Sequence, residues 1–446
     1  MAKEPLRTAP SSTTGLPPGI PYILTNEFCE RFAYYGMTGI LVMFMHGYLL
    51  GADGALSVMT DVQSQEWFHW FTAGTYFMAV LGALVSDVWL GKYRTIYFFS
   101  LLYCLGFGVM AIDQTRLGLM GGMALIAIGA GSVKPCVTAN VGDQFGASNK
   151  HLVSKIYSWF YFSINLGALI SMLLCPYLLK HYGPKWAFGV PAAAMMLATL
   201  AFRMGKRSYV HIPPTGRQVL RDLFNRETLT ILGRISVIMI FVSMFFALFY
   251  QSQGAWVLQA EKMELRWLWI NWIPAQFQAV NCLLILILIP VFNYAIYPAI
   301  DRVFPLTALR KIGLGMFVTA SAFLVSIWIE NQIAAGGTPS IGWQFLAYVP
   351  LTAGEIMVSI TVLEFSYTQA PKRLKSFVMA LYLLAISLGN AIPAIVNAFI
   401  QNPDGSSKLP GASYYWFFLI VMVVTATLFI PVAKRYVVQE YYHEEE

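Results

Sequence analysis

The feature that most constrains this chain is a series of apolar runs, each long enough to cross a lipid bilayer. A membrane-spanning helix needs about 20 predominantly apolar residues, and twelve such runs follow one another along the 446 residues. Hydrophobic residues make up 57% of the chain and charged residues only 11%, whereas a soluble domain has about 25% charged residues. The sequence therefore predicts an all-α integral membrane protein. The expected spans are 20–50, 64–90, 93–112, 117–141, 152–180, 185–203, 229–260, 273–300, 308–330, 341–369, 374–400 and 411–434.

Three ionisable residues, Glu27, Glu30 and Arg31, interrupt the first of these runs. Spacings of three and four residues place them on one face of a helix. An ionisable residue at the bilayer centre costs about 2.5–3.5 kcal/mol on insertion scales, and such residues usually face a bundle interior, a water-filled cavity or an ion or substrate pathway. We therefore expect a buried functional cluster. A static ion cluster that only holds this helix against its neighbours is the alternative.

The distribution of Lys and Arg predicts the orientation of the chain. Of its 29 basic residues, 20 fall on the two tails and the even-numbered loops, and six fall on the opposite side. By the positive-inside rule, both termini are cytoplasmic. The remaining three, Arg31, Lys134 and Arg234, are expected at membrane depth. The net charge of +7 is thus explained by membrane topology and by attraction of basic residues to anionic lipid, and it does not imply binding of nucleic acid.

The sequence offers no signal for a metal, a cofactor or a disulfide framework. Its five Cys residues are scattered through the expected spans, without metal-ligand or disulfide spacing. Neither a nucleotide-binding loop nor a nucleophile elbow is present. The first twenty residues lack an apolar signal-peptide core and are expected to form a polar tail.

The longest internal polar stretch divides the chain into two groups of six spans. We expect a tail at 1–19, a six-helix bundle at 20–203, a cytoplasmic linker at 204–228, a second bundle at 229–434 and a tail at 435–446. This arrangement fits the major facilitator architecture, in which substrate binds between the halves near mid-membrane. Residues 82–94 also resemble the glycine–aspartate–basic loop motif of that superfamily.

Four further segments resemble one family specifically. Residues 27–36 read EFCERFAYYG and 160–169 read FYFSINLGAL, which resemble the E-x-x-E-R-F-x-Y-Y-G and F-Y-x-x-I-N-x-G-S-L signatures of proton-dependent oligopeptide transporters. The segments 133–145, around Lys134, and 355–371, from Glu355, also resemble that family. The linker is too short for the two extra helices of many prokaryotic members, so the chain resembles a twelve-helix, prokaryotic-type member.

The resemblance implies a division of roles among the charged residues. Glu27, Glu30, Arg31 and Lys134 would take part in proton coupling, and His69 aligns with a proton-linked histidine of animal peptide transporters. Arg31 and Lys134 would also bind the peptide carboxylate, and Glu355 its amino group. A static salt bridge from Lys134 to helix 1, and ordinary packing for His69, are the alternatives.

The resemblance also implies which neutral residues contact substrate and which form gates. Asn165 and Asn281 would hydrogen-bond the peptide, and Trp256 would contact it unless it is an interfacial anchor. Three tyrosines are expected to line the site: Tyr34, Tyr35 and Tyr76. Packing, or a position in the interfacial belt, is the alternative for each of them.

The gate positions depart from the family pattern. Thr38 and Tyr250 stand where many members have an Arg and an acidic residue, so a different gate contact is expected. Arg234 is present, but Asn293 aligns with its usual aspartate partner. Glu364 is expected to be a packing or cytoplasmic-gate charge.

These observations predict a symporter that imports di- and tripeptides, with peptide-like drugs as further candidates and protons as the coupling ion in place of a cofactor. It would act as a monomer in a plasma membrane or bacterial inner membrane. One alternative keeps the fold but carries another small anionic or zwitterionic solute such as nitrate. The other is an intramembrane enzyme, although its catalytic motifs are missing, so we expect no enzyme.

Overall fold

The computed structural model describes residues 6–10, 13–216, 218–369 and 374–438. Parts of both expected tails, and residues 217 and 370–373 of the loops, lie outside the described residues. The chain folds into two compact units. The first unit comprises Met1–Val58 and Gly74–Asp222, and the second comprises Met59–Ala73 and Leu223–Glu446.

The described residues contain eleven helical spans that are long and apolar enough to cross a membrane. The helix α1 (Ile20–Gly47) is 28 residues long and carries the Glu27, Glu30 and Arg31 cluster, so it supplies the twelfth span. The observed ends lie within a few residues of those expected. The prediction of a twelve-helix, all-α membrane protein is thus confirmed.

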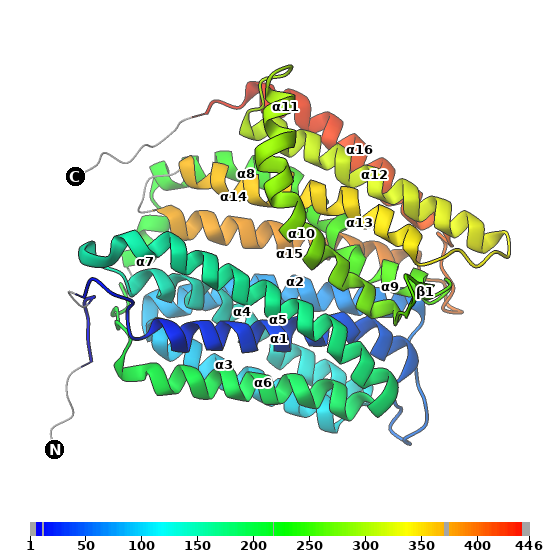
Figure 1. Cartoon of the computed structure of the whole chain (residues 1–446), viewed down its shortest axis with the longest axis horizontal. Helices are drawn as coiled ribbons and strands as arrows, with labels where there is room; N and C mark the ends of the chain where they lie inside the picture. Colours follow the sequence, from blue (N-terminus) through cyan, green and yellow to red (C-terminus); the bar gives the residue numbers. More distant parts are fainter. Residues whose placement is uncertain (1–5, 11–12, 217, 370–373, 439–446) are drawn as a thin grey trace. The chain divides into compact units, whose positions relative to one another are not determined.

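The first unit is built from six long helices and their connections (Figure 1). Within it, α1 packs against α5 and α6, and α3 packs against α4. The segment Met59–Ala73, which includes the start of α2, groups with the second unit. After α1, the elements are α2 (Asp61–Val85) with a π-helical end at Ser86–Leu90, α3 (Lys92–Ile112), α4 (Arg116–Asp143), a 3-10 turn at Ala147–Leu152, α5 (Val153–Tyr182), α6 (Pro184–Met204), a 3-10 turn at Gly205–Arg207 and α7 (Gln218–Leu223).

Helix breaks are more frequent in the second unit, where α12 packs against α13 and α16, and α15 packs against α8. A short hairpin of β1 (Arg266–Trp267) and β2 (Ile270–Asn271) was not expected from the sequence. The helices are α8 (Arg226–Phe249), α9 (Ala255–Ala260), α10 (Ala279–Val291), α11 (Tyr297–Asp301), α12 (Ala308–Ala334), α13 (Gly342–Glu355), α14 (Thr361–Thr368), α15 (Lys375–Ile400) and α16 (Ala412–Arg435). Single 3-10 or π turns lie at Tyr250–Gln253, Pro274–Gln278, Phe292–Ile296 and Ile356–Ile360.

Glycines allow α4 to approach its neighbours closely. A Cβ atom on Gly131 would lie 2.5 Å from the carbonyl oxygen of Thr75 on α2, and one on Gly129 would lie 2.7 Å from the Cβ of Tyr103 on α3. Real Cβ atoms do not occur at such distances from backbone atoms. These glycines therefore determine how closely α4, which carries Lys134, packs against α2 and α3.

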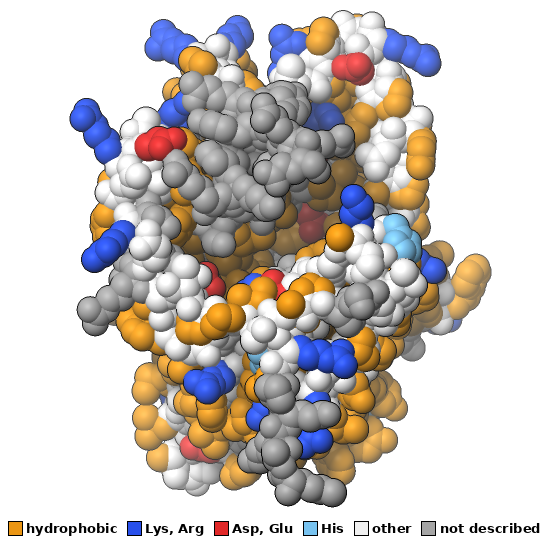
Figure 2. Space-filling model, turned by 90° about the vertical axis from the view of Figure 1, so that its left-hand side faces the viewer, with side chains coloured by type: hydrophobic (Ala, Val, Ile, Leu, Met, Phe, Trp, Pro, Cys, Tyr) orange, Lys and Arg blue, Asp and Glu red, His pale blue; other side chains and the backbone are white. Residues whose placement is uncertain are grey.

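Up to Gly216, the linker packs against the first unit. The ring of Tyr209 is 1% exposed and stacks on Phe202 with ring centroids 4.9 Å apart. The backbone N–H of Val210 donates to Oε1 of Gln144 at 3.1 Å, and that of His211 donates to the carbonyl of Arg7 at 2.7 Å. Figure 2, which views the end where α1 begins, shows Lys and Arg side chains spread over this face.

We expect Gly131→Ala to lower the thermal unfolding temperature of the purified protein, because the added methyl meets a backbone oxygen. Overpacking of this kind costs about 1–3 kcal/mol. Gly121→Ala is the control in the same helix, since a Cβ there meets no atom within 4 Å. Equal unfolding temperatures for the two variants would show that α4 tolerates a wider separation from α2.

Candidate functional site

The three ionisable residues of α1 form one buried cluster. Arg31 Nε lies 2.6 Å from Oε1 of Glu27 and 3.2 Å from Oε2 of Glu30. The side chains of Glu27 and Glu30 are 2% and 1% exposed, and that of Arg31 is 12% exposed. One guanidinium therefore balances two carboxylates in a region from which water is largely excluded.

Tyr103 on α3 adds a contact to this cluster that the sequence did not indicate. Its hydroxyl donates to Oε1 of Glu30 at 3.5 Å, and its side chain is fully buried. Nothing in the apolar run of α3 distinguishes Tyr103 from a packing residue. The related sequence feature is Gly129 on α4, where the absence of a side chain leaves room for the Cβ of Tyr103.

Lys134 lies in α4, where it is 8% exposed and immediately precedes a proline within the helix. Its Nζ stands 3.1 Å from the ring centroid of Tyr34 and 5.4 Å from that of Tyr76. Among the described residues this Nζ has neither a hydrogen-bond partner nor an ion-pair partner. The alternative of a static salt bridge to α1 is not what the structure contains, since Arg31 occupies both carboxylates.

Two further residues expected at the site, Tyr35 and Asn165, lie on α1 and α5. Tyr35 contacts Tyr34 edge to face, with ring centroids 5.5 Å apart. Asn165, on α5, donates its side-chain amide to the carbonyl of Tyr161 one turn earlier. A Cβ on the nearby Gly167 would lie 2.6 Å from the carbonyl of Phe28, so α5 packs closely against α1 beside the cluster.

Glu355 ends α13 in the second unit, where Pro350 and a following π turn interrupt the helix. Its Oε2 accepts a hydrogen bond from the amide of Asn281 at 3.0 Å, and the same amide donates to Thr352 Oγ1 at 3.0 Å. Glu355 and Asn281, each expected separately to bind the peptide, are thus in contact with each other. Among the described residues, no cation pairs with this carboxylate.

Trp256 and Tyr250 both lie inside the second unit. Trp256 is 1% exposed, and its ring contacts Tyr348 at 5.0 Å and Phe323 at 6.0 Å between centroids. An anchor at the membrane surface would be exposed, so that alternative for Trp256 is wrong. Tyr250 packs edge to face against Phe249, with centroids 5.5 Å apart, while Thr38 is buried in α1.

His69 lies in the part of α2 that groups with the second unit, whereas the α1 cluster belongs to the first. It is fully buried, and its Nδ1 lies 3.1 Å from Oδ1 of Asn390 on α15. Because that oxygen only accepts, Nδ1 carries the hydrogen. The other ring nitrogen, Nε2, has no hydrogen-bond partner among the described residues.

The three remaining gate candidates are dispersed. Arg234 donates a hydrogen bond from its guanidinium to the carbonyl of Val437 and lies 5.6 Å from the ring centroid of Tyr436, so it contacts the segment after α16. Asn293, which aligns with the usual aspartate partner of Arg234, is exposed on a π turn, and Glu364 is exposed on α14. The contact of Arg234 with a backbone carbonyl leaves no residue-specific signal in the sequence.

No group of three or more His, Cys, Asp or Glu side chains capable of holding a metal ion occurs among the described residues. The chemistry available in the two units is that of buried carboxylates, one guanidinium, one ammonium, one imidazole and aromatic rings. Such groups bind charged ligands and transfer protons.

Comparison with known proteins identifies the family. The profile of the POT family (PTR2) matches residues 93–232 and 218–417. "Peptide transporter family 1" of Drosophila melanogaster is 36% identical over 72% of this chain and 49% of its own length. "Solute carrier family 15 member 2" of Danio rerio is 35% identical over 72% of this chain and 50% of its own length. The chain thus spans about half the length of these curated relatives.

Solved structures agree with the sequence relatives. The crystal structure of the POT family transporter PepTSo superposes with a TM-score of 0.85 at 33% identity, covering 96% of this chain and all of that one. An auto-inhibited POT family peptide transporter also superposes with a TM-score of 0.85, at 32% identity and 96% coverage of this chain. The major facilitator fold expected from the sequence is therefore confirmed, and the chain belongs to the POT family of proton-dependent oligopeptide transporters.

Proposed function

We propose that this protein is a proton-coupled symporter that imports di- and tripeptides by alternating access. The observation that supports it most directly is a pair of opposite charges without ion-pair partners among the described residues, Lys134 in the first unit and Glu355 in the second. A zwitterionic peptide supplies the counter-charge of each. The proposal assigns its carboxylate to Lys134 and its ammonium to Glu355, with Asn281 holding the Glu355 carboxylate in place.

Proton coupling is assigned to the α1 cluster. Arg31 pairs with both Glu27 and Glu30, so movement of the guanidinium toward another anion would leave one buried carboxylate without its counter-charge, and uptake of a proton neutralises such a group. Coupling between two ligands typically amounts to about 1–3 kcal/mol. Rearrangement of one short contact, such as the 2.6 Å Arg31–Glu27 pair, is sufficient for this.

The site-lining roles of Tyr34, Tyr35, Tyr76, Asn165 and Trp256 remain part of the proposal. Tyr34 and Tyr76 support the Lys134 ammonium through their ring faces, because the face of an aromatic ring attracts a cation. His69 is proposed as a secondary proton-linked group, since its buried Nε2 has no partner.

The membrane assignment is that of a multi-pass transporter. We place it, acting as a monomer, in the plasma membrane or a bacterial inner membrane, with both termini on the cytoplasmic side. The excess of Lys and Arg on the tails and even-numbered loops supports this orientation. The intramembrane enzyme alternative is not retained because POT is a transporter family. The nitrate alternative is disfavoured because nitrate has no positive charge for the Glu355 carboxylate to bind.

The direct test is uptake of labelled dialanine into proteoliposomes with and without an inward proton gradient. We expect wild type to accumulate dialanine only with the gradient. Glu27→Gln should lose this accumulation and keep counterflow, because binding remains while proton coupling is removed. Glu264→Gln removes an exposed loop carboxylate and should behave as wild type. Absence of dialanine transport by wild type under both conditions would refute the proposed substrate.

The role of Glu355 is tested by comparing dialanine with N-acetyl-dialanine as competitors of uptake. Hydrogen bonds to a charged group contribute about 1.5–3 kcal/mol, so Glu355→Gln should weaken dialanine competition roughly 10- to 100-fold. Wild type should discriminate strongly against the acetylated peptide, and the variant should not. Discrimination that is unchanged in Glu355→Gln would assign the amino group to another residue.

Stability measurements separate the proposed role of the α1 cluster from a static one. Arg31→Gln leaves two buried carboxylates unpaired and should cost about 3–5 kcal/mol. Lys262→Gln, which breaks an exposed pair with Asp61, should cost at most about 1 kcal/mol.

Neutralising all of Glu27, Glu30 and Arg31 with Gln should recover most of the lost unfolding temperature, since neutral replacement of buried ion clusters is often well tolerated. It should not recover gradient-driven uptake. If this triple variant accumulated dialanine as wild type does, the cluster would be purely structural.

A further inference from the structure

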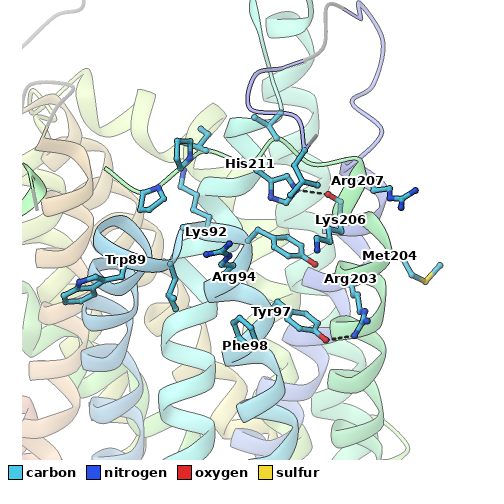
Figure 3. Close-up of a pocket in the computed structure, with 18 residues that line it drawn as sticks. Trp89, Lys92, Arg94, Tyr97, Phe98, Arg203, Met204, Lys206, Arg207 and His211 are labelled. Atoms are coloured by element: carbon cyan, nitrogen blue, oxygen red, sulfur yellow. Dashed lines mark hydrogen bonds between the residues drawn. The ribbon is translucent and has the colours of Figure 1, made fainter. Parts of the chain in front are cut away.

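A second concave site lies in the first unit, at the end where α3 begins (Figure 3). It is a cavity of about 720 Å³, formed by the α2–α3 turn, the first turns of α3, the end of α6, linker residues 210–214 and Leu6. None of the residues assigned above to proton coupling or peptide binding lines it. Its lining residues are Leu6, Trp89, Leu90, Gly91, Lys92, Tyr93, Arg94, Tyr97, Phe98, Arg203, Met204, Lys206, Arg207, Val210, His211, Ile212, Pro213 and Pro214.

The lining of this cavity is strongly and one-sidedly basic. Two lysines, three arginines and one histidine line it, and no Asp or Glu does. The nearest compensation is at Lys92, whose Nζ pairs with Asp143 at 2.6 Å. Among the described residues, Arg94, Lys206 and Arg207 have no carboxylate partner.

Aromatic rings hold several of these cations in place. Arg203 donates to the hydroxyl of Tyr97 at 2.7 Å, and Lys206 Nζ lies 5.7 Å from the ring centroid of Tyr93. Nε2 of His211 donates to the carbonyl of Lys206 at 2.7 Å, while its ring contacts Tyr93 at 4.9 Å. Arg203, Lys206 and His211 thus contact the rings of Tyr93 and Tyr97, which stack with centroids 6.3 Å apart.

The edge of the cavity is apolar and exposed. Trp89, Phe98 and Met204 are 62%, 56% and 72% exposed. In a protein that spans a bilayer, such side chains at the end of α2, the start of α3 and the end of α6 lie against lipid. A soluble anion would contact only the basic groups of the cavity. A phospholipid carries an anionic phosphate and acyl chains in one molecule, so it can contact the basic groups and the apolar edge together.

We propose that this cavity binds the phosphate of an anionic phospholipid headgroup, with Arg94 and Lys206 as the principal ligands and the exposed edge in contact with the acyl chains. Arginine suits this role because its planar fork of donors matches phosphate oxygens. Basic pockets on the cytoplasmic side of membrane proteins are typical sites for such headgroups. The linker and the N-terminal segment complete the cavity, so headgroup binding would also hold both against the first unit.

The test uses the full-length protein, stripped of lipid in detergent and titrated with dihexanoyl phosphatidylglycerol. Dihexanoyl phosphatidylcholine and inorganic phosphate serve as separate arms. Thermal unfolding and retained adducts in native mass spectrometry are the readouts. We expect phosphatidylglycerol to give a saturable rise in unfolding temperature and one retained adduct, and the other two compounds to give neither.

Arg94→Gln/Lys206→Gln should raise the half-saturating phosphatidylglycerol concentration at least about 10-fold. Arg226→Gln/Arg302→Gln removes the same charge from exposed positions outside the cavity and should match wild type. Lys206→Gln alone, as a milder change, should give a smaller shift in the same direction. Unchanged phosphatidylglycerol binding in the Arg94→Gln/Lys206→Gln protein would overturn the site. A full response to inorganic phosphate, with nothing added by phosphatidylglycerol, would overturn the lipid assignment.

Discussion

The first unit depends on the sharing of one guanidinium between two carboxylates inside α1. Burying Glu27 and Glu30 without Arg31 would leave two unpaired charges in a membrane helix, each costing several kcal/mol. With Arg31 in contact with both, at 2.6 and 3.2 Å, the helix can pack against α5 and α6 along its length. The close approach at Gly167 keeps α5 against the backbone beside this cluster.

Arg31 also determines the state of Lys134. Because the guanidinium occupies both carboxylates, the lysine ammonium rests on the ring of Tyr34 instead. Glycines bring α4 close to α2, since a Cβ on Gly131 would meet the backbone of α2. Tyr76 of α2 lies 5.4 Å from the same ammonium, measured to its ring centroid.

Most of the helical architecture was predictable from the sequence, because a bilayer requires spans of fixed length and the apolar runs have abrupt polar ends. The hairpin at residues 266–271 was not. Its strands are two residues long, and its turn places Leu268 and Trp269 at positive φ without the Gly or Asn that signals such turns. Tyr103 beside Glu30 and the Arg234 contact with Val437 were equally hidden. Both contacts join segments that are distant in the sequence. One uses a tyrosine in an apolar run and the other a backbone carbonyl, and no sequence pattern marks either group.

Under the proposed function, the unpaired charges account for both affinity and selectivity. A buried ammonium supported only by aromatic faces, and a carboxylate supported only by an amide, each bind an opposite charge more strongly than solvated side chains do. The proposed assignment gives a dipeptide one terminus for Lys134 and one for Glu355, whereas an anion such as nitrate has a charge for only the first. Selection then rests on the peptide termini, which are common to all small peptides, rather than on their side chains. This is the physical basis on which one site can accept many sequences and still reject solutes of single charge.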